Sequence, residues 1–134
     1  MAVSGIHHIG VAVADLDAAV ATYERLFGAR VERRERMAFD GVEAACMLVG
    51  KSRLELLAPT GEDTPVGRFL ARRGPGMHHV AFLVEDVGSE LARLDAEGAE
   101  LVDREPRPGL YGLQVAFLHP HATDGVLAEL VSDG

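Results

Sequence analysis

Apolar and polar residues alternate along two stretches of the chain that read almost alike. The segment GIHHIGVAVAD begins at Gly5, and GMHHVAFLVED begins at Gly76. Alternation with a period of two predicts a β-strand whose successive side chains point to opposite faces. Each strand then has one bulky face and one face of small residues. His8 and His79 lie on the small-residue faces, so we expect both to point into a cavity.

An amphipathic helix is predicted after each of these strands. Asp15 and Asp86 stand where a carboxylate can cap the helix start, and Gly28 and Gly98 stand where a left-handed residue can end it. The remainder of each half predicts three short strands. They are expected at residues 30–35, 42–49 and 53–57, and at residues 100–104, 113–119 and 126–131.

The order βαβββ is thus written twice, which predicts an α+β fold of two tandem modules related by a pseudo-twofold axis. We expect a single domain over residues 1–134, with module one at about 5–59, a linker at about 60–75 and module two at about 76–132. Within the linker, a short helix is expected to start near Pro65 and end at Gly74.

Two carboxylates complete a candidate site. Glu55 lies in the apolar stretch RLELLAP and Glu129 in GVLAELVSD, at matching positions of the repeat. An acid within an apolar strand is costly to bury without a partner. Taken singly, each of these residues is more often a core or surface residue than a ligand. If the modules pair symmetrically, His8, Glu55, His79 and Glu129 converge on one cavity. This donor set suits a divalent ion such as Co²⁺, Zn²⁺, Ni²⁺ or Mn²⁺.

Charge and composition exclude several classes of partner. The formal net charge of −8 argues against binding nucleic acid or an anionic membrane, since both need a basic face. No apolar run approaches the roughly 20 residues that cross a bilayer. The N-terminus lacks a basic region typical of a signal peptide, so a cytoplasmic location is expected. Cys46 is the single cysteine and is expected to be a small buried residue.

The chain resembles the methylmalonyl-CoA epimerases of the vicinal oxygen chelate superfamily. The resemblance covers nearly the whole length and is most specific in LELLAPTGEDTPVGRFLARRGPGMHHVAF; it extends to PRPGLYGLQVAFLHP and GVLAELV. It implies an open, curved mixed sheet around a metal ion, Co²⁺ above the others, with ligands at His8, Glu55, His79 and Glu129. It also implies a homodimer and an acyl-CoA thioester as substrate.

The implied reaction interconverts (2R)- and (2S)-methylmalonyl-CoA by removing and returning the proton α to the thioester. Epimerisation needs an acid/base group on each face of the α-carbon. The resemblance implies Glu129 for one face and a second glutamate for the other. Glu43, in DGVEAACMLVG, is the candidate, although Ala44 matches that glutamate position for position. A one-residue shift reverses the face of a strand side chain, so Glu43 is either the second base through a bulge or a surface residue.

Other functions stay open on the sequence alone. A glyoxalase I-type lyase acting on a glutathione hemithioacetal uses a similar metal site, and a metal-free drug-binding protein can share the fold. Extradiol dioxygenases and fosfomycin-inactivating thiol transferases share the fold but usually carry histidine where Glu55 stands, so they rank lower as alternatives.

His119 and His121, in HPHATDG, are expected to lie in a loop outside the ligand set. Several basic side chains are candidates for binding coenzyme A: Lys51, Arg53, Arg68, Arg72 and Arg73.

Overall fold

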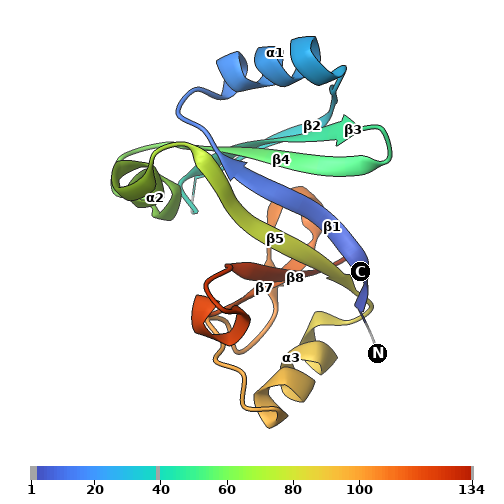
Figure 1. The fold of residues 1–134 in the computed structure, drawn as a ribbon. Coiled ribbons are helices and arrows are strands. Elements are labelled where there is room, and N and C mark those ends of the chain that lie inside the picture. Colours follow the sequence, from blue (N-terminus) through green and yellow to red (C-terminus); the bar gives the residue numbers. More distant parts are fainter. Residues whose placement is uncertain (1–2, 39, 134) are drawn as a thin grey trace. The chain divides into compact units, whose positions relative to one another are not determined.

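The computed structural model describes residues 3–38 and 40–133, and the chain separates into two units (Figure 1). The first, called here the His8 unit, comprises His8–His78. The second, the His79 unit, comprises Val3–His7 and His79–Asp133 among the described residues, so the first strand of each unit begins in the other unit. Each unit combines a four-stranded sheet with helix, which confirms the predicted α+β class. The assignment of the whole chain to one domain stays a prediction.

The elements of the His8 unit follow the predicted order βαβββ and continue into a further helix. Strand β1 runs parallel to β4, while β3 pairs antiparallel with both β2 and β4, so the sheet order is β2-β3-β4-β1. The elements are β1 (Val3–Ala12), α1 (Leu16–Phe27), β2 (Arg30–Met37), β3 (Val42–Val49), β4 (Ser52–Pro59) and α2 (Pro65–Arg73).

The His79 unit repeats this order with a shorter edge strand. Strand β5 runs parallel to β8, and β7 pairs antiparallel with β8 and β6, so the sheet order is β5-β8-β7-β6. Two short 3₁₀ turns, η1 and η2, flank β7. The elements are β5 (Gly76–Val84), α3 (Val87–Ala96), β6 (Arg107–Pro108), η1 (Leu110–Gly112), β7 (Gln114–Leu118), η2 (Pro120–Thr123) and β8 (Ala128–Ser132).

The helix boundaries lie where the sequence predicts them. The Asp15 carboxylate accepts a hydrogen bond from the backbone N–H of Ala18, and Asp86 caps α3 in the same way through Ser89, both at 3.1 Å. Gly28 ends α1 in the left-handed conformation with φ +65°, which glycine adopts without steric cost. Thr64 caps the start of α2 and Gly74 its end.

Each unit has its own apolar core between its helix and its sheet. In the His8 unit, Leu16 and Val20 of α1 pack against Met47 of β3 and Leu56 of β4. In the His79 unit, a matching cluster joins α3 to β7 and β8; its buried members are Val84, Val87, Leu91, Ala116, Leu118, Ala128 and Leu130. Burial of such apolar area is the main stabilising contribution to each unit.

One predicted strand is wrong. Residues 100–104 form no strand; Leu101 makes only an isolated bridge to Leu118. The regular ladder is interrupted because the backbone N–H groups of Val102 and Asp103 both donate to the Phe117 carbonyl, while the Asp103 carboxylate accepts from the Phe117 N–H at 2.8 Å. Antiparallel pairing resumes only at β6.

In the described residues, none of the helices is long and apolar enough to cross a membrane.

Candidate metal centre

The His8 unit holds a buried histidine–glutamate pair on the face of small residues. His8 lies on β1, two residues before Gly10, and Gly10 stands opposite Glu55 in the parallel β1–β4 register. The His8 Nε2 and Glu55 Oε1 atoms are 3.6 Å apart. Both residues are buried, with 4% and 5% of their surface exposed. The distance is longer than a good hydrogen bond, so the contact is mainly electrostatic.

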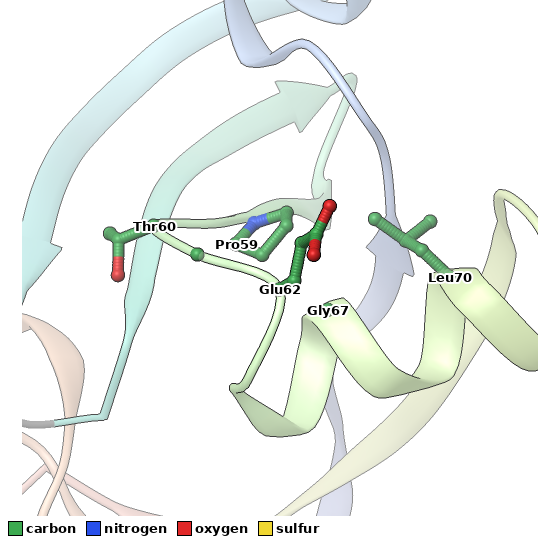
Figure 2. Close-up of a pocket in the computed structure, with 6 residues that line it drawn as sticks. Pro59, Thr60, Glu62, Gly67 and Leu70 are labelled. Atoms are coloured by element: carbon green, nitrogen blue, oxygen red, sulfur yellow. The ribbon is translucent and has the colours of Figure 1, made fainter.

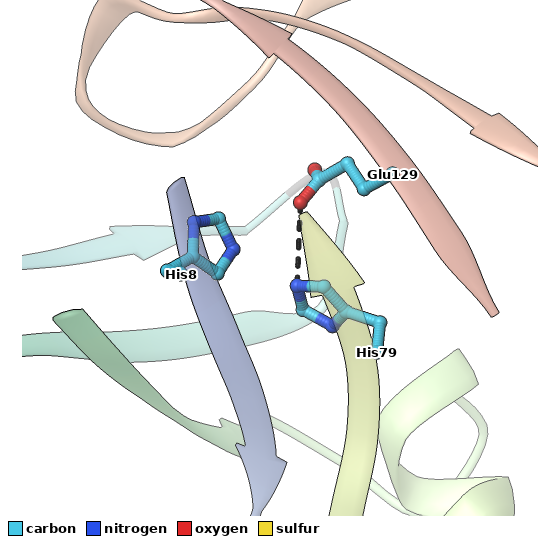
Figure 3. Close-up of side chains that lie close together, drawn as sticks. All are labelled: His8, His79 and Glu129. Atoms are coloured by element: carbon cyan, nitrogen blue, oxygen red, sulfur yellow. Dashed lines mark ion pairs between the residues drawn. The ribbon is translucent and has the colours of Figure 1, made fainter. Parts of the chain in front are cut away.

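The His79 unit holds the equivalent pair in the same register. His79 lies on β5, two residues before Ala81, and Ala81 stands opposite Glu129 of β8. The His79 Nε2 and Glu129 Oε1 atoms are 3.2 Å apart, the ion pair that Figure 3 marks with a dashed line. The Phe117 ring meets the His79 imidazole edge to face, with centroids 5.8 Å apart. Phe117 lies on β7, directly opposite Glu129 of β8.

The two pairs share their construction and their burial. Six polar or charged side chains are buried among the described residues, and four of them are the members of these pairs. Buried carboxylates need compensation, and an imidazole beside each of them contributes to it. Imidazole nitrogen with carboxylate oxygen is a donor set that transition metals bind. Each unit therefore holds one imidazole and one carboxylate of the kinds that bind such an ion.

Glu43 lies on the other face of its sheet. Direct antiparallel partners share a face, and Glu43 stands opposite Ala58, which belongs to the core beneath α1. Its carboxylate is 3.0 Å from Arg34, whose guanidinium also contacts Asp17 of α1 at 2.8 Å. These two carboxylates raise the pKa of Arg34 above its ordinary value. A catalytic role for Glu43 stays a prediction, which this ion pair does not favour.

Ala44 and Cys46 occupy the face that carries Glu55. In the β3–β4 register Cys46 stands directly opposite Glu55, and Ala44 follows the same alternation. Cys46 is buried as predicted. Burial, followed by its contact with Glu32, raises the pKa of the Cys46 thiol to about 12. The thiol is therefore a neutral donor beside the candidate ligand rather than a thiolate.

A β-bulge brings Glu32 to the same thiol, a contact that the sequence did not reveal. The β2–β3 register shifts between Val31 and Arg33, leaving Glu32 as the extra residue. Its carboxylate accepts from the Cys46 Sγ at 3.4 Å and from Arg53 Nε at 3.1 Å. No signal in the charged run VERRER marks the bulge, because every residue after Val31 is polar until Met37.

The segment before α2 borders a separate hollow. It has a volume of about 320 Å³ and lies between the end of β4 and the first turns of α2 (Figure 2). Its lining residues are Pro59, Thr60, Gly61, Glu62, Gly67 and Leu70, so the hollow includes neither histidine–glutamate pair.

Two of the basic residues predicted to bind coenzyme A have partners in and near α2. Arg68 pairs with Asp63 at 2.9 Å, and Arg73 stacks over Phe69.

The chain thus has duplicated βαβββ units, each with a buried histidine–glutamate pair. The model of the glyoxalase/bleomycin resistance protein/dioxygenase superfamily matches residues 7–117, and the chain belongs to this superfamily. Within it, the chain is similar to methylmalonyl-CoA epimerases over nearly its full length, which confirms the resemblance seen in the sequence.

Three similar proteins define this relationship. The uncharacterized protein YqjC of Bacillus subtilis is 38% identical over 93% of this chain and 89% of its own. The ethylmalonyl-CoA/methylmalonyl-CoA epimerase of Cereibacter sphaeroides is 36% identical over 93% and 95%. A solved methylmalonyl-CoA epimerase in complex with methylmalonyl-CoA and NH4+ is 40% identical, with a TM-score of 0.93 over 97% of this chain and 94% of that one.

Proposed function

We propose that this protein is a metal-dependent epimerase that interconverts (2R)- and (2S)-methylmalonyl-CoA. The observation that carries the proposal is the pair of equivalent buried contacts, His8–Glu55 and His79–Glu129. We propose that the two pairs surround one divalent ion, with Co²⁺ as the favoured candidate. Epimerases of this chemistry among the similar proteins support the substrate class.

The chemistry required is removal and return of a proton next to a thioester carbonyl. A divalent ion held by the four side chains would act as a Lewis acid for the oxygen that gains negative charge. Glu129 is the carboxylate proposed to take the α-proton and give it back. Its 7% exposure limits access of bulk water, and His79 keeps the carboxylate oriented at 3.2 Å. A positioned carboxylate of this kind contributes about 10²- to 10⁴-fold to a proton-transfer rate.

The test measures two signals in one experiment on the Co²⁺-loaded protein. Methylmalonyl-CoA of each configuration is incubated in deuterium oxide, and α-deuteration and inversion are followed separately. Wild type is expected to deuterate and invert both epimers. Glu129→Gln should carry out both reactions at least about 100-fold more slowly. Glu105→Gln, an exposed acid in the same unit, is the matched control. No turnover of either epimer by the metal-loaded wild type would refute the proposal.

The same experiment decides the role of Glu43. If Glu43→Gln slows deuteration of one epimer only, Glu43 is the second acid/base group. If both epimers exchange at the wild-type rate, Glu43 is an ion-pair partner of Arg34 on the α1 face and the second group lies elsewhere. A parallel assay with the glutathione hemithioacetal of methylglyoxal separates epimerase from lyase activity. Metal analysis of the purified protein separates both enzymes from a metal-free binding protein.

A further inference from the structure

Two histidines and a glutamate gather on the surface of the His79 unit, apart from its buried pair. Glu100 follows the end of α3, His119 caps η2, and His121 lies within η2. The backbone N–H of His119 donates to the Glu100 carbonyl at 2.9 Å, which holds the two segments together. Pro120 stands between the histidines and restricts the backbone there. The three side chains are thus brought together by main-chain structure rather than by a flexible loop.

The spacing of the polar atoms matches that of metal ligands. The Glu100 Oε2 atom is 3.1 Å from the His119 Nδ1 and 3.6 Å from the His121 Nδ1. A tetrahedral ion with bonds of about 2.1 Å keeps its ligand atoms about 3.4 Å apart. One ligand atom from each residue lies within 4.8 Å of the other two. Little movement is needed for all three to reach one ion.

A bound cation can replace the contacts that these groups make with one another. The His119 Nδ1 accepts a hydrogen bond from the His121 backbone N–H at 3.1 Å, and a bound ion would replace this N–H as the partner of the nitrogen's lone pair. Glu100 Oε2 presents another acceptor at the same distance from it. Between 38% and 78% of these side chains is exposed, so a dissolved ion can reach them.

We propose that Glu100, His119 and His121 form a second metal site, a surface site for a borderline divalent ion such as Zn²⁺ or Cu²⁺. Two imidazoles select these ions over Mg²⁺ and Ca²⁺, which prefer all-oxygen ligands. The remaining coordination positions are open to water, as in sites that are not purely structural. A bound ion would link the segment after α3 to η2. The site involves none of the residues of the proposed epimerase centre.

The experiment measures Zn²⁺ binding to the full chain, using a competing chromophoric chelator to count ions and obtain affinities. His121→Ala is the main variant because the His121 side chain is 78% exposed and its removal leaves the core intact. Glu100→Gln retains the side-chain size, and Glu105→Gln is the control for an exposed acid. Wild type and the Glu105→Gln control are expected to bind one Zn²⁺ per chain at this site. His121→Ala and Glu100→Gln should bind that ion at least about tenfold more weakly.

A second measurement locates the ion. Cu²⁺ added to about two equivalents per chain, enough to fill the buried pairs as well, is expected to broaden the backbone amide resonances near Glu100, His119 and His121 in wild type and to leave them sharp in His121→Ala. The His121 amide should also shift with Zn²⁺, because the ion competes for the lone pair that this N–H contacts. Unchanged Zn²⁺ binding in both variants, or broadening confined to other residues, would overturn the proposal. The comparison holds whether or not the buried pairs bind metal, so it is independent of the epimerase assay.

Discussion

Replacing either of two glycines near helix starts by alanine should change the free energy of unfolding, but in opposite directions. Gly67 lies in the first turn of α2, and Gly88 in the first turn of α3. A Cβ added at Gly67 would lie 2.5 Å from the Gly61 carbonyl oxygen and 2.6 Å from that of Glu62. Both are backbone atoms, so the chain itself must move. At Gly88 the nearest neighbour is the Pro106 Cγ at 3.6 Å, an ordinary contact.

The magnitude follows from two opposing effects. Alanine is favoured over glycine in a helix by about 1 kcal/mol. Overpacking against rigid neighbours costs about 1–3 kcal/mol, and the new Cβ also crowds the Thr64 hydroxyl that caps α2, at 2.9 Å. Losing such a cap costs about 1 kcal/mol. We therefore expect Gly67→Ala to lower the free energy of unfolding by about 1–3 kcal/mol, whereas Gly88→Ala should raise it by about 0.5–1 kcal/mol.

Urea titration followed by far-UV circular dichroism tests both variants against wild type. The transition midpoints should move in opposite directions while the slope of free energy against urea stays the same. Thermal midpoints should differ from wild type by a few degrees, at about 3 °C per kcal/mol for a chain of this size. If Gly67→Ala is as stable as wild type or more so, the close backbone approach is absent in solution and the reasoning fails.

Three further predictions concern a thiol, a core residue and the proposed buried metal centre. Since the folded pKa of Cys46 is raised to about 12, the native thiol should react with a disulfide reagent at pH 8 far more slowly than the thiol of the urea-unfolded chain, and equal rates would contradict its burial. The contribution of this thiol to the free energy of unfolding should decline as pH rises from about 9 to about 12. Leu91→Ala should cost about 2–5 kcal/mol, because Leu91 is 2% exposed, and Leu94→Ala, at a partly buried position of the same helix, should cost less. In the His121→Ala background, adding Co²⁺ to chelator-stripped protein should raise the thermal midpoint, and an unchanged midpoint would count against an ion at the buried pairs.

Local patterns predicted much of the fold because the interactions concerned are close in sequence. The two carboxylate caps, the left-handed Gly28 and the face of His8 on its strand each depend on a few neighbouring residues. The likeness of the two halves aligned His8 with His79 and Glu55 with Glu129, since repeated modules place equivalent residues in equivalent registers. The structure then showed which residues meet: His8 contacts Glu55, and His79 contacts Glu129.

The errors and omissions concern contacts set by strand register and by main-chain hydrogen bonds between distant segments. The predicted strand at residues 100–104 fails because Phe117 bonds twice to the Val102–Asp103 backbone. The bulge at Glu32 is invisible in a run of charged residues, as is the meeting of Glu100 with the η2 histidines. Nothing in the local pattern distinguishes these positions from ordinary surface residues.

The sequence by itself therefore determined the repeated βαβββ order and the members of the two buried pairs, because periodicity and duplication are written in consecutive residues. Only the tertiary structure decided that Glu43 faces α1 while Cys46 and Ala44 share the face of Glu55. Alternation along a strand gives two faces but does not say which one meets the helix when both carry small residues. That choice is made by the packing of α1 on Ala45 and Met47 and by the hydrogen-bond register with β4.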